Sequence, residues 1–198
     1  MFTGIIETIG IVDEVLHINS NKTYWISSSI SKELKVDQSV SHNGICLTVE
    51  EVDGNRHRVT AIKETLEKTT IDRWAKQNKV NLERCLQFNG RLDGHIVQGH
   101  IDTTGICIKA EAQNGSWVYQ FQFAENFAEL LVEKGSIAIN GISLTIFDVK
   151  TDLFSVAIIP FTYTHTNMQD IQEGSVVNLE YDIIGKYVQR NQLLQGTT

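Results

Sequence analysis

The 198-residue chain carries a formal net charge of -7, with 41% hydrophobic and 21% charged residues. This composition is typical of a globular protein and allows either one large domain or two of roughly 90 residues each. The acidic balance argues against a nucleic-acid partner and against an acidic membrane surface, because both are bound mainly through clustered Lys and Arg.

The sequence carries no sign of export or of membrane insertion. No stretch reaches the roughly 20 apolar residues that a membrane span needs, and the N-terminus lacks the basic region of a secretory leader. The three cysteines, Cys46, Cys85 and Cys107, are odd in number and form no Cys-x-x-Cys pair. We therefore expect a cytoplasmic protein with reduced thiols.

The first half of the chain predicts short strands separated by turns. Ile9–Val12, Leu47–Val49 and His57–Ile62 are rich in β-branched residues, and the Asp-Gly-Asn of residues 53–55 marks a turn. Lys63–Thr65, taken alone, predicts a charged, solvated strand end. The pattern as a whole favours a small antiparallel barrel or sandwich.

The second half repeats the first. The aligned segments are 39–49 with 136–146, 80–83 with 177–180, and 4–10 with 99–105. The first two pairs share an offset of 97 residues, and the third has an offset of 95. This predicts two homologous domains, 1–90 and 91–183, joined in the turn-rich segment 88–94.

Two helices are predicted in the second half. Residues 125–134 place Phe127, Leu130 and Leu131 on one face, and Gly135 is a C-terminal stop. After Asp182, apolar residues recur at helical spacing outside the repeated unit. We therefore predict a helix over 184–198 that packs on something other than its own barrel.

One motif occurs twice. Residues 43–48 read Asn-Gly-Ile-Cys-Leu-Thr and residues 140–145 read Asn-Gly-Ile-Ser-Leu-Thr. Asn-Gly readily adopts positive φ and turns the chain into a strand, on which alternate residues share a face. The paired residues are Cys46 with Thr48 and Ser143 with Thr145. A hairpin with core packing explains one such motif. Its recurrence with small polar side chains on the same face favours two polar ligand-binding surfaces, here called walls, and the change from Cys to Ser indicates that their roles have diverged.

Two histidines, His95 and His100, lie close together beside glycines. Metal ligation, acid–base chemistry and structural hydrogen bonding are the alternatives. Metal is the weakest, since no carboxylate or third histidine stands at ligand spacing. His100 occupies the position of Ile5 in the repeat, so the second half gains a group that the first lacks.

Signatures of other enzyme classes are lacking. The sequence contains no Gly-x-Gly-x-x-Gly, no phosphate-binding Gly-x-x-x-x-Gly-Lys and no Gly-x-Ser-x-Gly. We therefore expect neither a nucleotide cofactor nor a serine nucleophile of the hydrolase type.

Together these motifs resemble the riboflavin synthase family. The resemblance runs from Met1 to about Tyr187 and rests on Met1–Glu7, both Asn-Gly-Ile-x-Leu-Thr segments, Lys63–Leu66, Val80–Arg84 and Gly94–His100. It implies an all-β fold of two tandem, duplicated, six-stranded antiparallel Greek-key barrels with a C-terminal α-helix. It further implies a homotrimer whose active site lies between the N-terminal barrel of one chain and the C-terminal barrel of a neighbour.

The activity that the resemblance implies is a dismutation. A transferase of this family moves four carbons between two molecules of 6,7-dimethyl-8-ribityllumazine, giving riboflavin and 5-amino-6-(ribitylamino)pyrimidinedione, in the last step of riboflavin biosynthesis. The lumazine and riboflavin are then the expected ligands, and no metal or other cofactor is required. An association with lumazine synthase, which makes the substrate, stays open.

The resemblance also implies the site residues. One wall comprises Phe2, Thr3, Ser39, Cys46, Thr48, Ile62 and Lys63; the facing wall comprises His100, Ser143, Thr145, Ile159, Thr162 and Asp182; Gly4, Thr65 and Gly99 complete the set. Three of these are expected catalytic residues: His100 moves or orients a proton, Ser143 binds the ring, and Cys46 adds to the acceptor ring or stands beside a water that does so.

One position departs from the common family pattern, because Phe161 stands where Glu or His often precedes the Thr. The main rival is a lumazine-binding antenna protein, which lacks polar residues of the second site; His100, Ser143 and Thr145 argue against it. A flavin reductase barrel would need a following nucleotide-binding domain, for which this chain has no room. A purely structural module would need no polar walls.

Overall fold

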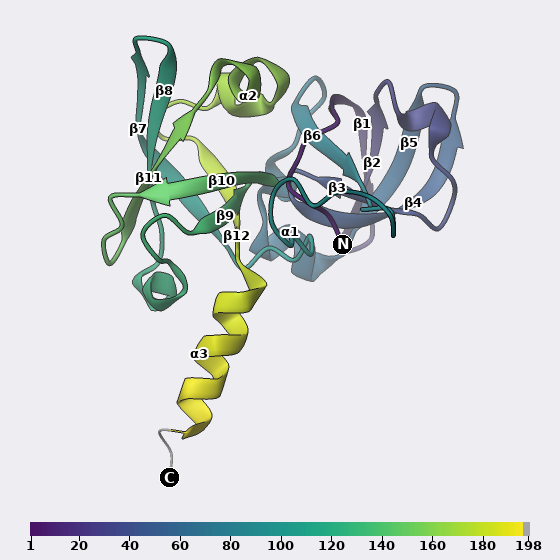
Figure 1. Cartoon of the computed structure of the whole chain (residues 1–198). Helices are drawn as coiled ribbons and strands as arrows, with labels where there is room; N and C mark the ends of the chain where they lie inside the picture. The colour runs from purple at the N-terminus through teal and green to yellow at the C-terminus, as the bar shows by residue number, and fades with distance from the viewer. Residues whose placement is uncertain (196–198) are drawn as a thin grey trace.

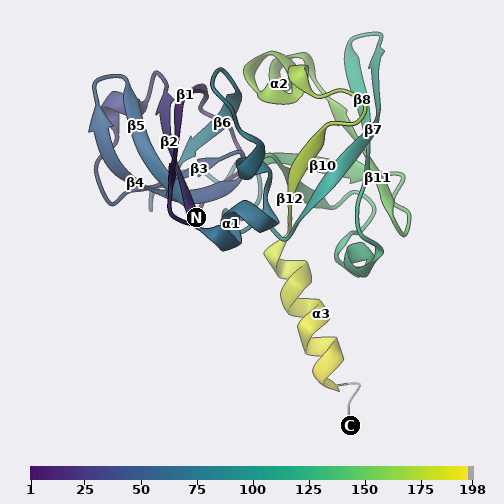
Figure 2. The ribbon, with the colours of Figure 1, turned by 180° about the vertical axis from the view of Figure 1, so that it is seen from behind.

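The computed structural model describes residues 1–195 of the chain. Two closed antiparallel barrels lie side by side, and a single helix leaves the second barrel and extends away from both (Figures 1 and 2). Each barrel has six strands. The all-β class, the duplicated barrels and the C-terminal helix expected from the sequence are thus confirmed.

The first barrel has the strand order β1-β2-β5-β4-β3-β6. Its strands are β1 (Thr8–Ile18), β2 (Asn21–Ser27), β3 (Ser39–His42), β4 (Ile45–Asp53), β5 (Arg56–Ala61) and β6 (Lys79–Arg84). The buried residues of β5 alternate as a barrel strand requires, with His57, Val59 and Ala61 inside. Closure of the barrel leaves no unpaired sheet edge.

The second barrel repeats this connectivity in the order β10-β11-β8-β7-β12-β9. Its strands are β7 (Thr103–Gln113), β8 (Ser116–Gln122), β9 (Ser136–Ile139), β10 (Ile142–Phe147), β11 (Leu153–Ile158) and β12 (Val176–Tyr181). Even the irregularities correspond: a register shift follows Val12 in β1 and Cys107 in β7, two positions 95 residues apart (107 − 12). The sequence repeat is therefore a repeat of structure.

Short helices connect the strands at equivalent places in both barrels. The α-helices are α1 (Lys63–Lys68) and α2 (Pro160–His165), and the 3-10 helices are η1 (Ser31–Glu33), η2 (Thr70–Arg73), η3 (Glu125–Leu130) and η4 (Asn167–Asp170). Two predictions about the secondary structure of these connecting segments are wrong, and both were based on local sequence pattern.

The predicted helix over 125–134 is only the 3-10 helix η3, which ends at Leu130. The chain must turn back to enter β9 at Ser136, and it does so through a tight turn in which Gly135 N donates to Val132 O at 2.8 Å. Lys134 takes a positive φ of 64° in this turn. The apolar face that suggested an α-helix instead packs on the barrel as a short turn.

The predicted strand end at Lys63–Thr65 is the first turn of helix α1. Its side chains are solvated as expected, but they pair along a helix. Lys68 contacts Glu64 at 2.8 Å, and Lys63 lies 3.7 Å from Glu67, both at i,i+4 spacing. Such pairs support a helix and have no equivalent along a single strand.

The two barrels meet through a symmetric network of buried asparagines. Asn81 Nδ2 donates to Asn140 O at 3.0 Å, and Asn178 Nδ2 donates to Asn43 O at 2.9 Å, so the repeat-related residues exchange bonds. Asn167 Nδ2 also donates to Asn43 Oδ1 at 3.0 Å. Buried amides are costly unless they are paired, and here each pairing needs the other barrel.

The C-terminal helix α3 (Ile183–Gln195) begins where Ile184 N donates to Asp182 Oδ1 at 3.0 Å. It touches its own barrel mainly at its start, through Lys186 Nζ and Asp102 Oδ2 at 2.6 Å and through Gln189 and Glu129. The rest projects outward (Figures 1 and 2). The helix predicted over 184–198 is confirmed up to Gln195; residues 196–198 lie outside the described residues.

Several large apolar side chains of α3 are exposed, namely Ile184, Tyr187, Val188, Leu193 and Leu194. Within residues 1–195, none of the helices has the length and apolar character that spanning a bilayer would require. Ile184, Tyr187 and Val188 stand at i,i+3 and i,i+4 spacing and form an apolar stripe in the first half of this projecting helix.

Candidate functional site

The first candidate site is built on strand β4 and is called here the Cys46 site. Asn43 and Gly44 take positive φ values of 48° and 81°, and this turn directs the chain into β4. Cys46 is half-buried and Thr48 is exposed on the same face, beside Ser39, which pairs with Thr48 across β3 and β4. The predicted polar wall is thus present, with alternate residues facing outward.

The Cys46 site also receives a segment from the second half of the chain. Cys46 N donates to Gly99 O at 2.9 Å, and His100 follows, exposed. Gly99 has a φ of 83°, and a Cβ there would lie 2.5 Å from the Cβ of Cys46. Only glycine permits this close approach and this backbone conformation. His100 is therefore carried to the wall of the first barrel.

The second candidate site, built on strand β10, is called the Ser143 site. Ser143 N donates to Gly4 O at 2.8 Å, so a segment of the first half lies on the wall of the second barrel. Gly4 has a φ of 79°, and a Cβ there would lie 2.5 Å from the Cβ of Ser143. Thr145 is exposed on the same face, and it pairs with Ser136 of β9. The geometry mirrors the Cys46 site.

The structure groups the expected residues differently from the walls that the resemblance implies. Within one chain, His100 accompanies Cys46, and Gly4 accompanies Ser143. Phe2 and Thr3, expected on a ligand wall, are 1% and 7% exposed. Phe2 forms a β-bridge with Val97, its own equivalent in the repeat. The physical reason is that the leading segments of the two halves cross, each docking on the other barrel.

The remaining expected residues surround these walls. Ile62 and Ile159 are 54% and 61% exposed at the entrances to α1 and α2, and Lys63, Thr65 and Thr162 lie in the first turns of these helices. Asp182 is farther along the chain, where its carboxylate caps α3 and lines a cavity of about 660 Å³ beside that helix. In one chain the two walls are open surfaces with apolar residues at their edges.

His95 joins the Ser143 site, although it was not among the expected site residues. Its Nδ1 lies 2.7 Å from Ser143 Oγ, and it is 8% exposed. Its Nε2 is buried without a hydrogen-bond partner among the described residues. Burial lowers the pKa of His95, so the neutral ring is favoured. The Gly94-His95 dipeptide was the available signal in the sequence, and only the fold brings it to Ser143.

Cys46 differs electrostatically from an activated thiol. Burial raises the pKa of its thiol, although a hydrogen bond with Ser39 opposes this change. A raised thiol pKa makes the nucleophilic thiolate scarce at neutral pH.

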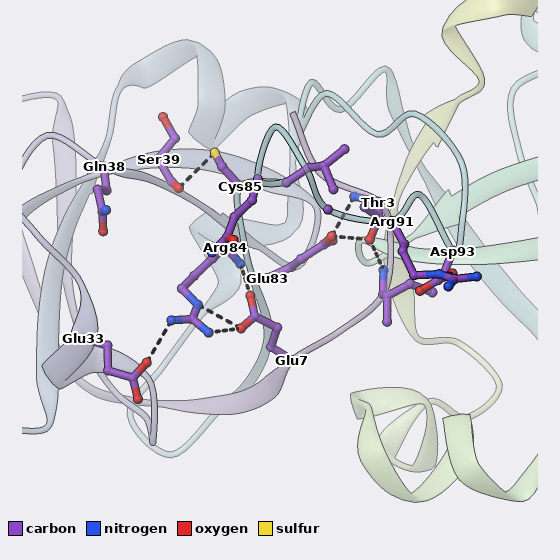
Figure 3. Close-up of a pocket in the computed structure, with 14 residues that line it drawn as sticks. Thr3, Glu7, Glu33, Gln38, Ser39, Glu83, Arg84, Cys85, Arg91 and Asp93 are labelled. Carbon is purple, nitrogen blue, oxygen red and sulfur yellow. Dashed lines mark hydrogen bonds and ion pairs between the residues drawn. The ribbon is translucent and has the colours of Figure 1, made fainter.

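A cavity of about 690 Å³ opens between the end of the first barrel and the link to the second (Figure 3). Thr3 and Ser39 line it, but its central cation is already neutralised: Arg84 contacts Glu7 at 2.6 Å and Glu33 at 2.9 Å. Among residues 1–195, no group of three or more His, Cys, Asp or Glu residues is placed to hold a metal ion.

Both halves of the chain match a known domain family. The lumazine binding domain matches residues 3–85 and 98–182. The structure is similar to a crystal structure of LumP complexed with riboflavin, with a TM-score of 0.85 over 91% of this chain and 99% of that chain. The identity to LumP is 23%, so this likeness bears on the fold alone.

Similarity in sequence is greater to catalytic relatives. The chain is 38% identical to the riboflavin synthase of Actinobacillus pleuropneumoniae over 192 residues, covering 96% of this chain and 89% of that protein. It is 37% identical to the riboflavin synthase of Bacillus subtilis strain 168, with the same coverage of both chains. With two crossed polar walls on duplicated barrels, the chain belongs to the riboflavin synthase family.

Proposed function

We propose that this protein catalyses the dismutation of 6,7-dimethyl-8-ribityllumazine, in which a four-carbon unit passes from one molecule to another to give riboflavin and 5-amino-6-(ribitylamino)pyrimidinedione. The observation that carries this proposal is the pair of matched walls, since a reaction between two identical substrates calls for two similar sites. The 38% identity to a riboflavin synthase supports it.

The chain's part in such a reaction is mainly to orient two ligands. The two products together contain the atoms of two substrates, so the reaction needs no external oxidant or reductant. Holding two rings in reactive contact replaces a bimolecular encounter and accounts for much of the rate of such reactions. The exposed apolar and polar residues of each wall supply a flat contact for a ring and hydrogen-bond partners for its edge.

The roles of individual residues follow from their positions. His100, exposed beside Cys46, is suited to take the proton from the acidic 7-methyl group of a bound lumazine. Ser143, hydrogen-bonded to His95, is suited to bind the ring in the other site. Phe161, 68% exposed in place of the usual polar residue, stacks on His165 with ring centroids 4.0 Å apart and adds apolar surface at the start of α2.

The proposal includes a homotrimer in the cytoplasm. Each site is open in the single chain, and Tyr187 is 72% exposed on the projecting helix α3, so a neighbouring chain would both cover the helix and close the walls. The alternative is a fluorescent antenna protein that binds the same lumazine, and it predicts ligand binding without turnover.

The deciding experiment mixes purified, cofactor-free protein with 6,7-dimethyl-8-ribityllumazine and follows riboflavin absorbance. We expect one riboflavin for every two lumazines consumed. A His100→Ala variant, which still presents both walls, serves as the matched control and should bind lumazine while turning over slowly. Tight binding with bright fluorescence and no riboflavin would refute the enzyme and support the antenna.

The chemistry of Cys46 is tested by Cys46→Ser. Since the pKa of the thiol is raised, we expect the variant to keep turnover within about 10-fold of the parent chain, because Ser preserves size and hydrogen bonding. Loss of a covalent nucleophile would cost on the order of 10³-fold or more. Steady-state kinetics of the two chains distinguish the outcomes, and a loss of that size would restore Cys46 as the nucleophile.

A further inference from the structure

Two buried glutamates are left unused by the proposed chemistry. Glu83 at the end of β6 and Glu180 in β12 are 3% and 1% exposed, and they are 97 residues apart (180 − 83), so they occupy the same place in the repeat. Neither is part of the Cys46 or Ser143 wall. A buried carboxylate is costly unless it is well bonded, so its occurrence in both barrels calls for a reason.

Glu180 binds the backbone of the segment that leads to His100. It accepts hydrogen bonds from Gln98 N at 2.6 Å, Gly99 N at 2.9 Å and His100 N at 3.0 Å. All three partners are donors, which suits the ionised, acceptor-only carboxylate. Bonds to a charged acceptor are stronger than neutral ones, and three of them fix the path of successive residues.

Glu83 repeats this arrangement in the first barrel. It accepts hydrogen bonds from Thr3 N at 2.6 Å and from Thr3 Oγ1 at 2.6 Å (Figure 3). It also accepts one from Gly4 N at 3.0 Å. The bound segment again carries the glycine that rests on a wall. The two carboxylates therefore hold equivalent pieces of chain in equivalent ways.

Each held segment rests on the opposite barrel. The segment bound by Glu180 offers Gly99 O to Cys46 N, and the segment bound by Glu83 offers Gly4 O to Ser143 N. We propose that Glu180 is the positioning residue of the Cys46 site and Glu83 that of the Ser143 site, so that each barrel sets the geometry of the other barrel's site. The effect of this positioning on catalysis rests on the proposed function, whereas the positioning of the two segments does not.

The first experiment measures position without relying on turnover. In Glu180→Gln the amide nitrogen cannot accept, so at least one of the three bonds is lost at nearly constant volume. Opening of the segment should then expose Cys46 to iodoacetamide, with labelling about 10-fold faster, the factor expected for one charge-assisted hydrogen bond. Labelling at each cysteine is read by peptide mass spectrometry.

The chain contains its own controls. Cys107 is buried in the second barrel, so its labelling reports general loosening of the barrel that holds Glu180. Glu83→Gln is the matched variant, because Glu83 is a similarly buried carboxylate that also accepts three hydrogen bonds, two from backbone N–H groups and one from the Thr3 hydroxyl, but serves the other site. We expect faster labelling of Cys46 only in Glu180→Gln, with Cys107 unchanged. Unchanged Cys46 labelling, or a parallel rise at Cys107, would overturn the proposal.

The second experiment measures whether the positioning of the His100 segment by Glu180 affects the rate of turnover. We expect Glu180→Gln to lower kcat/KM for the lumazine about 10-fold in the parent chain and less than about 2-fold in a His100→Ala background. The second loss is smaller because Glu180 acts by positioning the His100 segment, and the His100 side chain is already absent. Glu83→Gln should cost the same factor in both backgrounds. Equal losses from Glu180→Gln in both would overturn its role in turnover. Absence of turnover in the parent chain would refute the proposed function instead, and the labelling result would still decide on Glu180.

Discussion

The first barrel contains two histidines whose buried hydrogen bonds specify their protonation. His42 Nδ1 must donate to Val40 O at 2.9 Å, so His42 Nε2 accepts, and His57 Nε2 must donate to it at 2.9 Å. His57 Nδ1 then accepts from Ser31 Oγ at 2.8 Å. Each ring is neutral in this chain of bonds, and a proton added to His42 Nε2 would face the N–H of His57 instead of an acceptor.

This pair predicts loss of stability in acid. Burial lowers the pKa of His57 to about 4 and holds that of His42 well below 6.5. Below pH 6.5 the unfolded chain therefore binds protons that the folded chain does not, so stability is full above pH 6.5 and falls as the pH decreases. The slope should be about 1.4 kcal/mol per pH unit for each histidine.

The test is His57→Gln, whose amide can accept from Ser31 and donate to His42 while removing one titrating group. Urea unfolding at pH 7.5, 6.5 and 5.5 should show a weaker pH dependence in the variant than in the parent chain. His17→Gln, which changes an exposed histidine, is the matched control. An equal pH slope in His57→Gln and the parent would contradict this account.

At the scale of elements, local pattern predicted the strands better than the short helices. Alternating β-branched runs mark barrel strands because one face of each is buried. The segments Lys63–Lys68 and Glu125–Leu130 are too short for periodicity to identify, and their form depends on where the next strand must begin. The longer helix α3 was predictable because several turns repeat the same apolar spacing.

Helix α3 carries a prediction of its own. Removing residues after Asp182 should leave both barrels folded, because the helix contacts its barrel mainly through Lys186 and Gln189. It should also lower the sedimenting mass from that of the proposed trimer to that of a single chain. Tyr187→Asp, which keeps the helix but puts a charge on its apolar stripe, should act in the same direction. A truncated chain with undiminished mass would contradict the role of α3 in assembly.

At the scale of the whole molecule, the main feature is that the two halves are interlocked. The asparagine network joins the barrels at their centre, and the leading segments cross so that each barrel completes the other's wall. Neither site exists in one isolated half. A duplication that produced two independent barrels would have lost the contacts between Gly4 and Ser143 and between Gly99 and Cys46.

The sequence by itself determined the duplication, the short antiparallel strands of both halves, the C-terminal helix and the two polar walls. The strands and the walls recur in both halves at a fixed offset, and spacing along a strand dictates which side chains share a face. The helix follows from its own apolar spacing. Only the tertiary structure decided which distant residues lie beside each wall. It places His100 next to Cys46, and it places His95 and Gly4 next to Ser143. These contacts join residues far apart in the chain, and they depend on glycines and buried glutamates whose role no local pattern encodes.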